Sequence, residues 1–220
     1  MNCRIAGILL SLSLLWFANQ SKAQQAFVEG TIVYAVSIGP VTGNAGFTEH
    51  AGTYTLTVKG ATLRKELQMN SGYQNVLIEN RNTGTLYSLR PAAGQNYAIQ
   101  ISPQDIAEKM KPYEGFSQKE EEGTMTIAGQ PCRKVTIQYK DGNTSSMYYT
   151  TAWTTSDAAL FERFPGIKYI PLSFEYRNDE AITMHFAAEK IEAKPVESAL
   201  FRVPPDYKII SNAEYKAMRK

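Results

Sequence analysis

The sequence predicts a mainly β protein of the α+β kind, with a curved antiparallel sheet of about ten or eleven strands and two or three short helices on its concave side. Two observations predict this fold class. Apolar and polar residues alternate in short runs along most of the chain, as they do in strands with one buried and one solvated face. Turns rich in Gly, Asn and Asp separate these runs, which is typical of an antiparallel meander. We expect a single domain over 24–220.

Residues 1–23 have the pattern of a cleaved secretory signal peptide. A positively charged start precedes an apolar run at 5–18, and Ser21 and Ala23 place small residues where a signal peptidase reads them. The alternative is a buried or anchoring N-terminal helix, but the run is short for a membrane span. We expect cleavage between Ala23 and Gln24, and a periplasmic or secreted product without a transmembrane segment.

Charge and cysteine content narrow the choice of partners. The chain has 220 residues with 23 basic and 21 acidic side chains, and two of the basic residues, Arg4 and Lys22, precede the expected cut. The mature chain is therefore formally neutral, which gives no reason to expect nucleic acid as a partner. Only Cys132 remains after cleavage, so no intrachain disulfide can form. We interpret it as a buried core thiol, with an intermolecular disulfide or a reactive thiol as the alternatives.

The first half of the mature chain is predicted to be a series of strands followed by one helix. The alternating runs place strands at 28–38, 53–59, 63–69, 75–80, 85–90 and 95–101. Ser102 then has the features of a helix N-cap, with Pro103 at the first helical position and Asp105 three residues after the cap. Ile106 and Met110 form the narrow apolar stripe of this short helix.

The segment 111–123 is the best candidate for a linker. It contains one Lys and three Glu in succession at 119–122, which we interpret as a solvated loop. A metal site is the alternative, but adjacent Glu residues cannot converge on one ion without partners elsewhere.

Strands resume in the second half, so no domain boundary is indicated. We expect them at 124–128, 133–140, 145–151, 170–176 and 182–188. Asp141-Gly142 is a strong signal for a hairpin turn between two of these strands. A second helix is expected at 156–164 and a closing helix from Ser211 to the end, whereas 196–203 fits either a strand or a helical turn.

The sequence offers no pattern of catalytic residues. His50 and His185 are its two histidines, and no spacing links them to each other or to a nucleophile. The sequence lacks the motifs typical of nucleotide, metal or nucleophile sites. We therefore expect a protein that is not an enzyme and that uses no cofactor and no metal.

The apolar residues carry the functional hypothesis. The chain contains thirteen Tyr, nine Phe and seven Met, and the predicted sheet has enough strands to curl. Two short helices would cover only part of its apolar face. The interior is then either a ligand cavity or a filled core. The alternating pattern shows which side chains face the interior, but it does not show whether that interior is filled. The candidate lining consists of apolar-phase residues from the predicted strands: Tyr34, Val36, Leu56, Val58, Leu67, Tyr97, Ile99, Ile137, Phe174 and Met184.

Two segments carry a resemblance to a known family. Residues 127–134 read Ile-Ala-Gly-Gln-Pro-Cys-Arg-Lys and precede the Asp-Gly turn, and residues 201–207 read Phe-Arg-Val-Pro-Pro-Asp-Tyr. They resemble the Ile-x-Gly-x-x-Cys-x-Lys and Phe-x-x-Pro-x-x-Tyr stretches of an exported envelope family of unknown function with a LolA/LolB-like half-barrel fold. The resemblance implies the architecture of lipoprotein carriers, which hold acyl chains in a hydrophobic cavity. It matches none of the carriers' binding elements residue by residue.

These observations lead to one functional expectation and one alternative. We expect a non-enzymatic protein of the cell envelope that binds an apolar or lipid-like small molecule inside a curved sheet. The alternative is an interaction module that docks an envelope protein and takes no small molecule.

The signal peptide can be tested directly. Protein isolated from the producing cell should begin at Gln24 in N-terminal sequencing, because the small residues before it suit a signal peptidase. An intact Met1, or a terminus blocked by lipid, would contradict this prediction.

Overall fold

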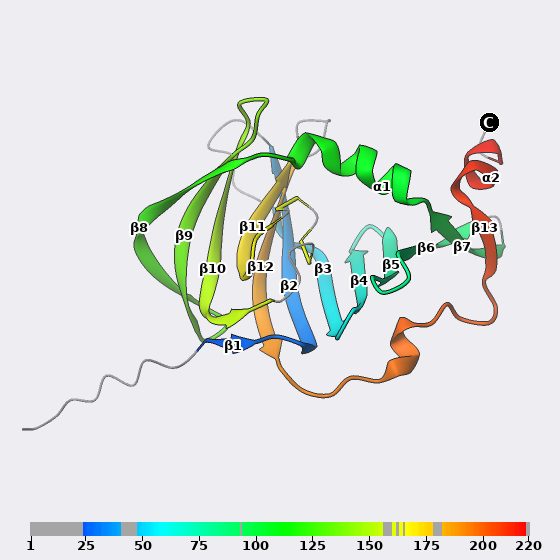
Figure 1. Cartoon of the computed structure of the whole chain (residues 1–220), viewed down its shortest axis with the longest axis horizontal. Coiled ribbons are helices and arrows are strands. Elements are labelled where there is room, and N and C mark those ends of the chain that lie inside the picture. The colour runs from blue at the N-terminus through cyan, green and yellow to red at the C-terminus, as the bar shows by residue number, and fades with distance from the viewer. Residues whose placement is uncertain are drawn as a thin grey trace, which may run out of the picture.

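Thirteen strands within the described residues form one curved sheet (Figure 1). The computed structural model describes residues 24–40, 48–92, 94–155, 160–161, 163–164, 166–177 and 182–218. The predicted signal peptide lies outside this part of the chain. The fold class expected from the sequence, a curved, mainly antiparallel half-barrel with few short helices, is confirmed.

The sheet consists of two antiparallel meanders joined through β2 and β12. The first meander comprises β2 (Glu29–Pro40), β3 (Thr48–Lys59), β4 (Thr62–Met69), β5 (Gln74–Asn80), β6 (Thr85–Ala92) and β7 (Gln95–Ile101). The second comprises β8 (Ser117–Ile127), β9 (Gln130–Gln138), β10 (Thr144–Thr154), β11 (Tyr169–Arg177) and β12 (Ile182–Glu192). Two short strands pair in parallel, β1 (Gln25–Ala26) with β10 and β13 (Lys208–Ser211) with β7.

The strand count was therefore underestimated, since the sequence predicted about ten or eleven strands and the described residues contain thirteen. The two strands that were missed, β1 and β13, are two and four residues long. Strands this short display no alternation, and only their pairing partners reveal them.

The predicted loop at 111–123 is also wrong. Its first residues form a short 3₁₀ helix, η1 (Lys111–Tyr113), and β8 begins at Ser117 and runs through the acidic residues. Partners on β9 and β10 explain this. Tyr149 donates a hydrogen bond to Glu120 Oε1 at 2.6 Å, and Lys134 Nζ lies 2.6 Å from Glu121 Oε2. The Lys134 ammonium lowers the pKa of the Glu121 carboxyl. Cross-strand pairs of this kind favour a strand where the local sequence favours a loop.

Helices cover part of the sheet on both faces. α1 (Pro103–Met110) begins as expected, because the Ser102 side chain accepts a hydrogen bond from Asp105 N. α2 (Asn212–Ala217) forms within the predicted closing helix, and Ser211 and Glu214 make a capping box at its start. At 196–203 the helical turn is confirmed as the 3₁₀ helix η2 (Ser198–Phe201).

The predicted helix at 156–164 falls largely outside the described residues. Of its members that the structure does describe, Leu160, Phe161 and Phe164 are buried in the main core.

The main core lies on the concave face and is centred on aromatic rings from four central strands. The aromatic cluster, as it is called below, comprises Tyr34, Tyr54, Phe174, Tyr176 and Phe186. Phe174 and Phe186 stack with ring centroids 4.8 Å apart, and Tyr34 meets Phe174 edge-on at 5.4 Å. Such offset and edge-on contacts add stability beyond the buried area alone.

The Tyr34 hydroxyl fixes this cluster to the backbone. It donates a buried hydrogen bond of 2.9 Å to the carbonyl oxygen of Pro171 on β11. Burial raises the pKa of Tyr34, so the phenol keeps its proton and remains a donor.

A smaller core lies on the opposite, convex face. Val76, Ile78, Leu89 and Ala98 form it, and side chains from the C-terminal segment pack against it. η2 lies on this face too, because the Leu200 carbonyl accepts a hydrogen bond from Arg64 Nη1 at 3.4 Å. The part of the chain that contains η2, Val203 and Tyr207 therefore lies on the convex side.

The meanders join where β2 and β12 come very close together. A Cβ atom added to Gly30 would lie 2.1 Å from the Glu192 carbonyl oxygen, and the Gly30 φ of +150° already disfavours other residues. The register between the two strands also shifts between Ala188 and Lys190. Such irregularities increase the local twist, which helps the sheet to curl.

Cys132 lies at the start of β9 with 1% of its surface exposed. Burial raises the pKa of its thiol to about 11, so at neutral pH the reactive thiolate is scarce. We predict slow labelling of the native protein by a bulky thiol reagent. Replacement by Ala should lower the free energy of unfolding by about 1–2 kcal/mol, as a small cavity does. Labelling as fast as in the unfolded chain would contradict the burial.

Candidate functional site

Two neighbouring cavities lie between α1 and the concave face of the sheet. The edge cavity, about 550 Å³ and partly open to solvent, is lined by α1, α2 and strands β5 to β7. The central cavity, about 220 Å³, lies between α1, the aromatic cluster and the described residues of 160–163. Figure 1 shows α1 running across the open side of the sheet. The cavities share four wall residues: Asn75, Leu77, Lys109 and Met110.

The central cavity is walled mainly by apolar side chains. Tyr54, Tyr176 and Phe186 form one wall, so the margin of the aromatic cluster is also the surface of the cavity. Leu67 from β4 and Met184 from β12 complete it. This lining of aromatic, aliphatic and thioether groups is typical of sites for apolar ligands.

The edge cavity is apolar at its floor and its roof. Leu77, Leu86 and Ile101 come from adjacent strands, and the register places them on the same face of the sheet. Ile106 and Met110 face them from α1. The apolar stripe of α1 is therefore part of a cavity wall, and no residue of α1 is fully buried.

Three basic residues also line the central cavity: Lys65, Lys109 and Arg163. Lys65 is only 5% exposed, and its Nζ lies 3.8 Å from Glu79 Oε2. The Arg163 guanidinium stacks on the Tyr176 ring at 4.4 Å and on the Tyr113 ring at 5.2 Å. These cation–π contacts hold a positive charge against an apolar wall.

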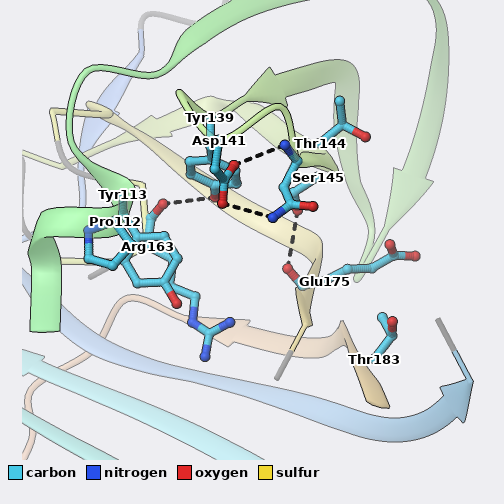
Figure 2. Close-up of a pocket in the computed structure, with 10 residues that line it drawn as sticks. Pro112, Tyr113, Tyr139, Asp141, Thr144, Ser145, Arg163, Glu175 and Thr183 are labelled. Carbon is cyan, nitrogen blue, oxygen red and sulfur yellow. Dashed lines mark hydrogen bonds between the residues drawn. The ribbon is translucent and has the colours of Figure 1, made fainter. Parts of the chain in front are cut away.

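A third, more polar pocket of about 330 Å³ lies beside the central cavity, with which it shares Tyr113 and Arg163 (Figure 2). Figure 2 shows its polar groups bonded to one another. Tyr139 donates to the Arg163 carbonyl oxygen at 3.0 Å, and Ser145 donates to the Glu175 carbonyl oxygen at 3.1 Å. Because these groups hold each other, the pocket forms a polar margin to the central cavity.

Residue types of a catalytic triad meet at one place on the sheet. Ser173 Oγ lies 3.4 Å from His185 Nε2, and His185 Nδ1 lies 3.7 Å from Glu175 Oε1. However, Ser173 is only 8% exposed, and 3.7 Å exceeds the length of a hydrogen bond. The contact links β11 to β12 and gives no support for nucleophilic catalysis. Among the described residues, no group of three His, Cys, Asp or Glu side chains is placed to hold a metal ion.

The predicted lining residues fall into three groups. Leu67 and Met184 line the central cavity. The largest group is packed within the main core: Tyr34, Val36, Leu56, Val58, Ile137 and Phe174. Ile99 is buried and Tyr97 half-buried on β7, next to the short edge strand β13 and away from the central strands.

Several cavity residues were missed by the sequence analysis. Lys65 could have been identified from the sequence, because it lies between Leu63 and Leu67 at a position of β4 where the alternation expects an apolar residue. A lysine at that position points into the interior and needs a partner there. Lys109 and Arg163 had no such signal, since their position depends on how α1 and 160–163 cross the sheet.

The Lys65–Glu79 pair can be tested by two substitutions. Glu79→Gln should lower the free energy of unfolding by about 1–3 kcal/mol, because it leaves a nearly buried ammonium without its carboxylate. Lys65→Met should cost less, since it removes the buried charge and keeps a linear chain of similar length. Urea denaturation of both variants measures the difference, and a larger loss for Lys65→Met would contradict this account.

No family model and no curated protein sequence matches this chain. Within the described residues, no helix has both the length and the apolar character needed to cross a bilayer.

Several solved structures are similar to this chain, at low sequence identity. The structure of the Pseudomonas aeruginosa MucA/MucB complex matches with 14% identity and a TM-score of 0.41, over 84% of this chain and 59% of that chain. This chain therefore spans less than two thirds of that chain. A LolA superfamily protein from Nitrosomonas europaea matches with 7% identity and a TM-score of 0.38, over 82% and 92%. The Mycobacterium tuberculosis lipoprotein LppX matches with 8% identity and a TM-score of 0.40, over 77% and 89%. Scores of this size say nothing about what the present chain binds.

Proposed function

We propose that this protein binds an apolar, lipid-like ligand between α1 and the concave face of the sheet. The proposal includes export to the periplasm or the medium after removal of 1–23. The observation that carries it is the pair of adjoining cavities, whose shared wall contains Leu77 and Met110. In this proposal, Leu67 and Met184 contact the ligand. The more deeply buried candidate residues pack behind the cavity wall and do not contact the ligand.

The cavity sizes support a ligand larger than water. Sites for small organic ligands generally have volumes of about 300–1,000 Å³. The edge cavity, at about 550 Å³, lies within that range, and the central cavity adjoins it. Each methylene group buried in such a site contributes about 0.8 kcal/mol. A chain of roughly ten methylenes would therefore gain up to ~8 kcal/mol before the entropy cost of association.

The packing of α1 supports the same proposal. Its N-terminus is fixed by the Ser102 cap, yet every residue of the helix remains at least partly exposed. Ile106 and Met110 face a cavity. If the core were filled, the helix would bury these two side chains. An acyl chain would give these side chains the apolar contacts that a packed core normally supplies.

A docking face for another protein is less well supported. Such a face is usually one contiguous exposed apolar patch. The large apolar side chains exposed among the described residues come instead from separate elements and connections: Val28, Tyr73, Met125, Leu200, Ile209 and Met218.

The proposal predicts saturable binding of a fluorescent fatty acid whose emission depends on its surroundings. Titration against the mature chain should saturate near one equivalent, because the cavities adjoin and hold a single chain. Leu77→Trp should weaken binding at least about tenfold, since the indole would fill the wall shared by both cavities. Leu200→Trp places the same substitution on η2, on the convex face, and is the matched control.

Two results would contradict the proposal. One is wild-type protein that shows no saturable binding, which would favour the docking alternative. The other is equal weakening by Leu77→Trp and Leu200→Trp when both variants keep the wild-type thermal midpoint, since the probe would then bind elsewhere.

A further inference from the structure

The charged groups around the three cavities are distributed unequally. The edge cavity has three acidic and three basic residues in its walls: Glu79, Asp105, Glu108, Arg90, Lys109 and Lys216. The polar pocket beside Tyr139 has both signs as well. The central cavity, by contrast, has three basic residues and, among the described residues that line it, no acidic one.

Lys109 has the position required of an anchor for an anion. It is the one basic residue shared by the central and edge cavities, and it makes no ion pair with another described residue. It lies in the last turn of α1, where the helix carbonyl groups stabilise its own charge. Because Lys109 is exposed, its attraction for an anion depends on the salt concentration.

A second polar group stands at the same junction. Asn75 lines both cavities, and its Oδ1 atom is buried without a hydrogen-bond partner among the described residues. Buried polar atoms are nearly always bonded, and an unbonded amide oxygen requires a hydrogen-bond donor, which an ionised acid head group does not supply. Half a turn of the amide would offer the Nδ2 donor in place of the oxygen. A purely apolar ligand would satisfy neither Asn75 nor Lys109.

We propose that the ligand is an anionic amphiphile whose acid head group lies at Lys109 and Asn75, with its chain along the apolar walls. This inference rests on the proposed function and adds the chemistry of the head group to it. Arg163, held over Tyr176 at 4.4 Å, adds a second positive charge on the far side of the same cavity. Lys65 contributes less to the field at the head group, because Glu79 lies beside it.

The test compares probes that share one chain length and differ in charge. Dodecanoate, dodecanol and dodecyltrimethylammonium compete with a neutral environment-sensitive dye for the mature protein at neutral pH and low salt. Dodecanoate should bind at least roughly tenfold more tightly than dodecanol, and the cationic probe more weakly than either. The preference for dodecanoate should shrink as salt is added, because salt screens charges near the surface.

Two variants locate the head group. Lys109→Gln should reduce the preference for dodecanoate over dodecanol to about threefold or less. Lys119→Gln, at an exposed site on β8, is the matched control and should keep the preference. Both lysines are on the surface, so both variants should keep the wild-type thermal midpoint.

The outcomes separate this inference from the proposed function. Equal binding of dodecanoate and dodecanol by the wild type would overturn the anionic head group and leave the apolar site standing. A preference that survives Lys109→Gln would overturn its location. If no probe binds, the proposed function fails and the inference fails with it.

Discussion

The aromatic cluster is the constraint on which the rest of the structure depends. The apolar residues on the concave side of a curled sheet need packing partners, and here Tyr34, Phe174 and Phe186 pack together at the centre. The hydrogen bond from Tyr34 to Pro171 fixes the cluster to the backbone of β11. At its margin, Tyr54 and Tyr176 have neighbours on one side and a cavity on the other. The core therefore ends where the proposed site begins, because the rings of the aromatic cluster pack in the core and also line the central cavity.

The division of the covering segments explains why the cavities lie where they do. The segment that contains η2, Val203 and Tyr207 packs on the convex face and completes the small core there. Among the described residues, α1, η1, α2 and part of 160–167 cover the concave side, and α1 is eight residues long. A helix of this length cannot fill the space over β5 to β7. As a result, both cavities are lined by aliphatic and aromatic side chains, and basic side chains lie where the two cavities meet.

Local patterns predicted the strands well because alternation reports directly which face of a strand is buried. They failed where a partner distant in sequence decides the outcome. Residues 117–123 form a strand because Tyr149 on β10 binds Glu120 and Lys134 on β9 pairs with Glu121, and the local sequence does not reveal these partners. The predicted lining had the same limit. The alternating pattern places Phe174 and Met184 on the same face of the sheet. The position of α1, Leu160 and Phe161 decides that Phe174 is in the core and Met184 in a cavity wall.

Native mass spectrometry of the mature protein, freshly purified from the cell that produces it, tests the central claim most directly. The account predicts a non-covalent adduct of lipid-like mass at one equivalent, which organic extraction removes and negative-ion analysis identifies as an acid. The same preparation of Leu77→Trp should carry much less of it, because the indole occupies the shared wall. A wild-type spectrum that shows only the mass of the polypeptide, under conditions that retain the adduct of a known lipid-binding protein, would contradict the claim.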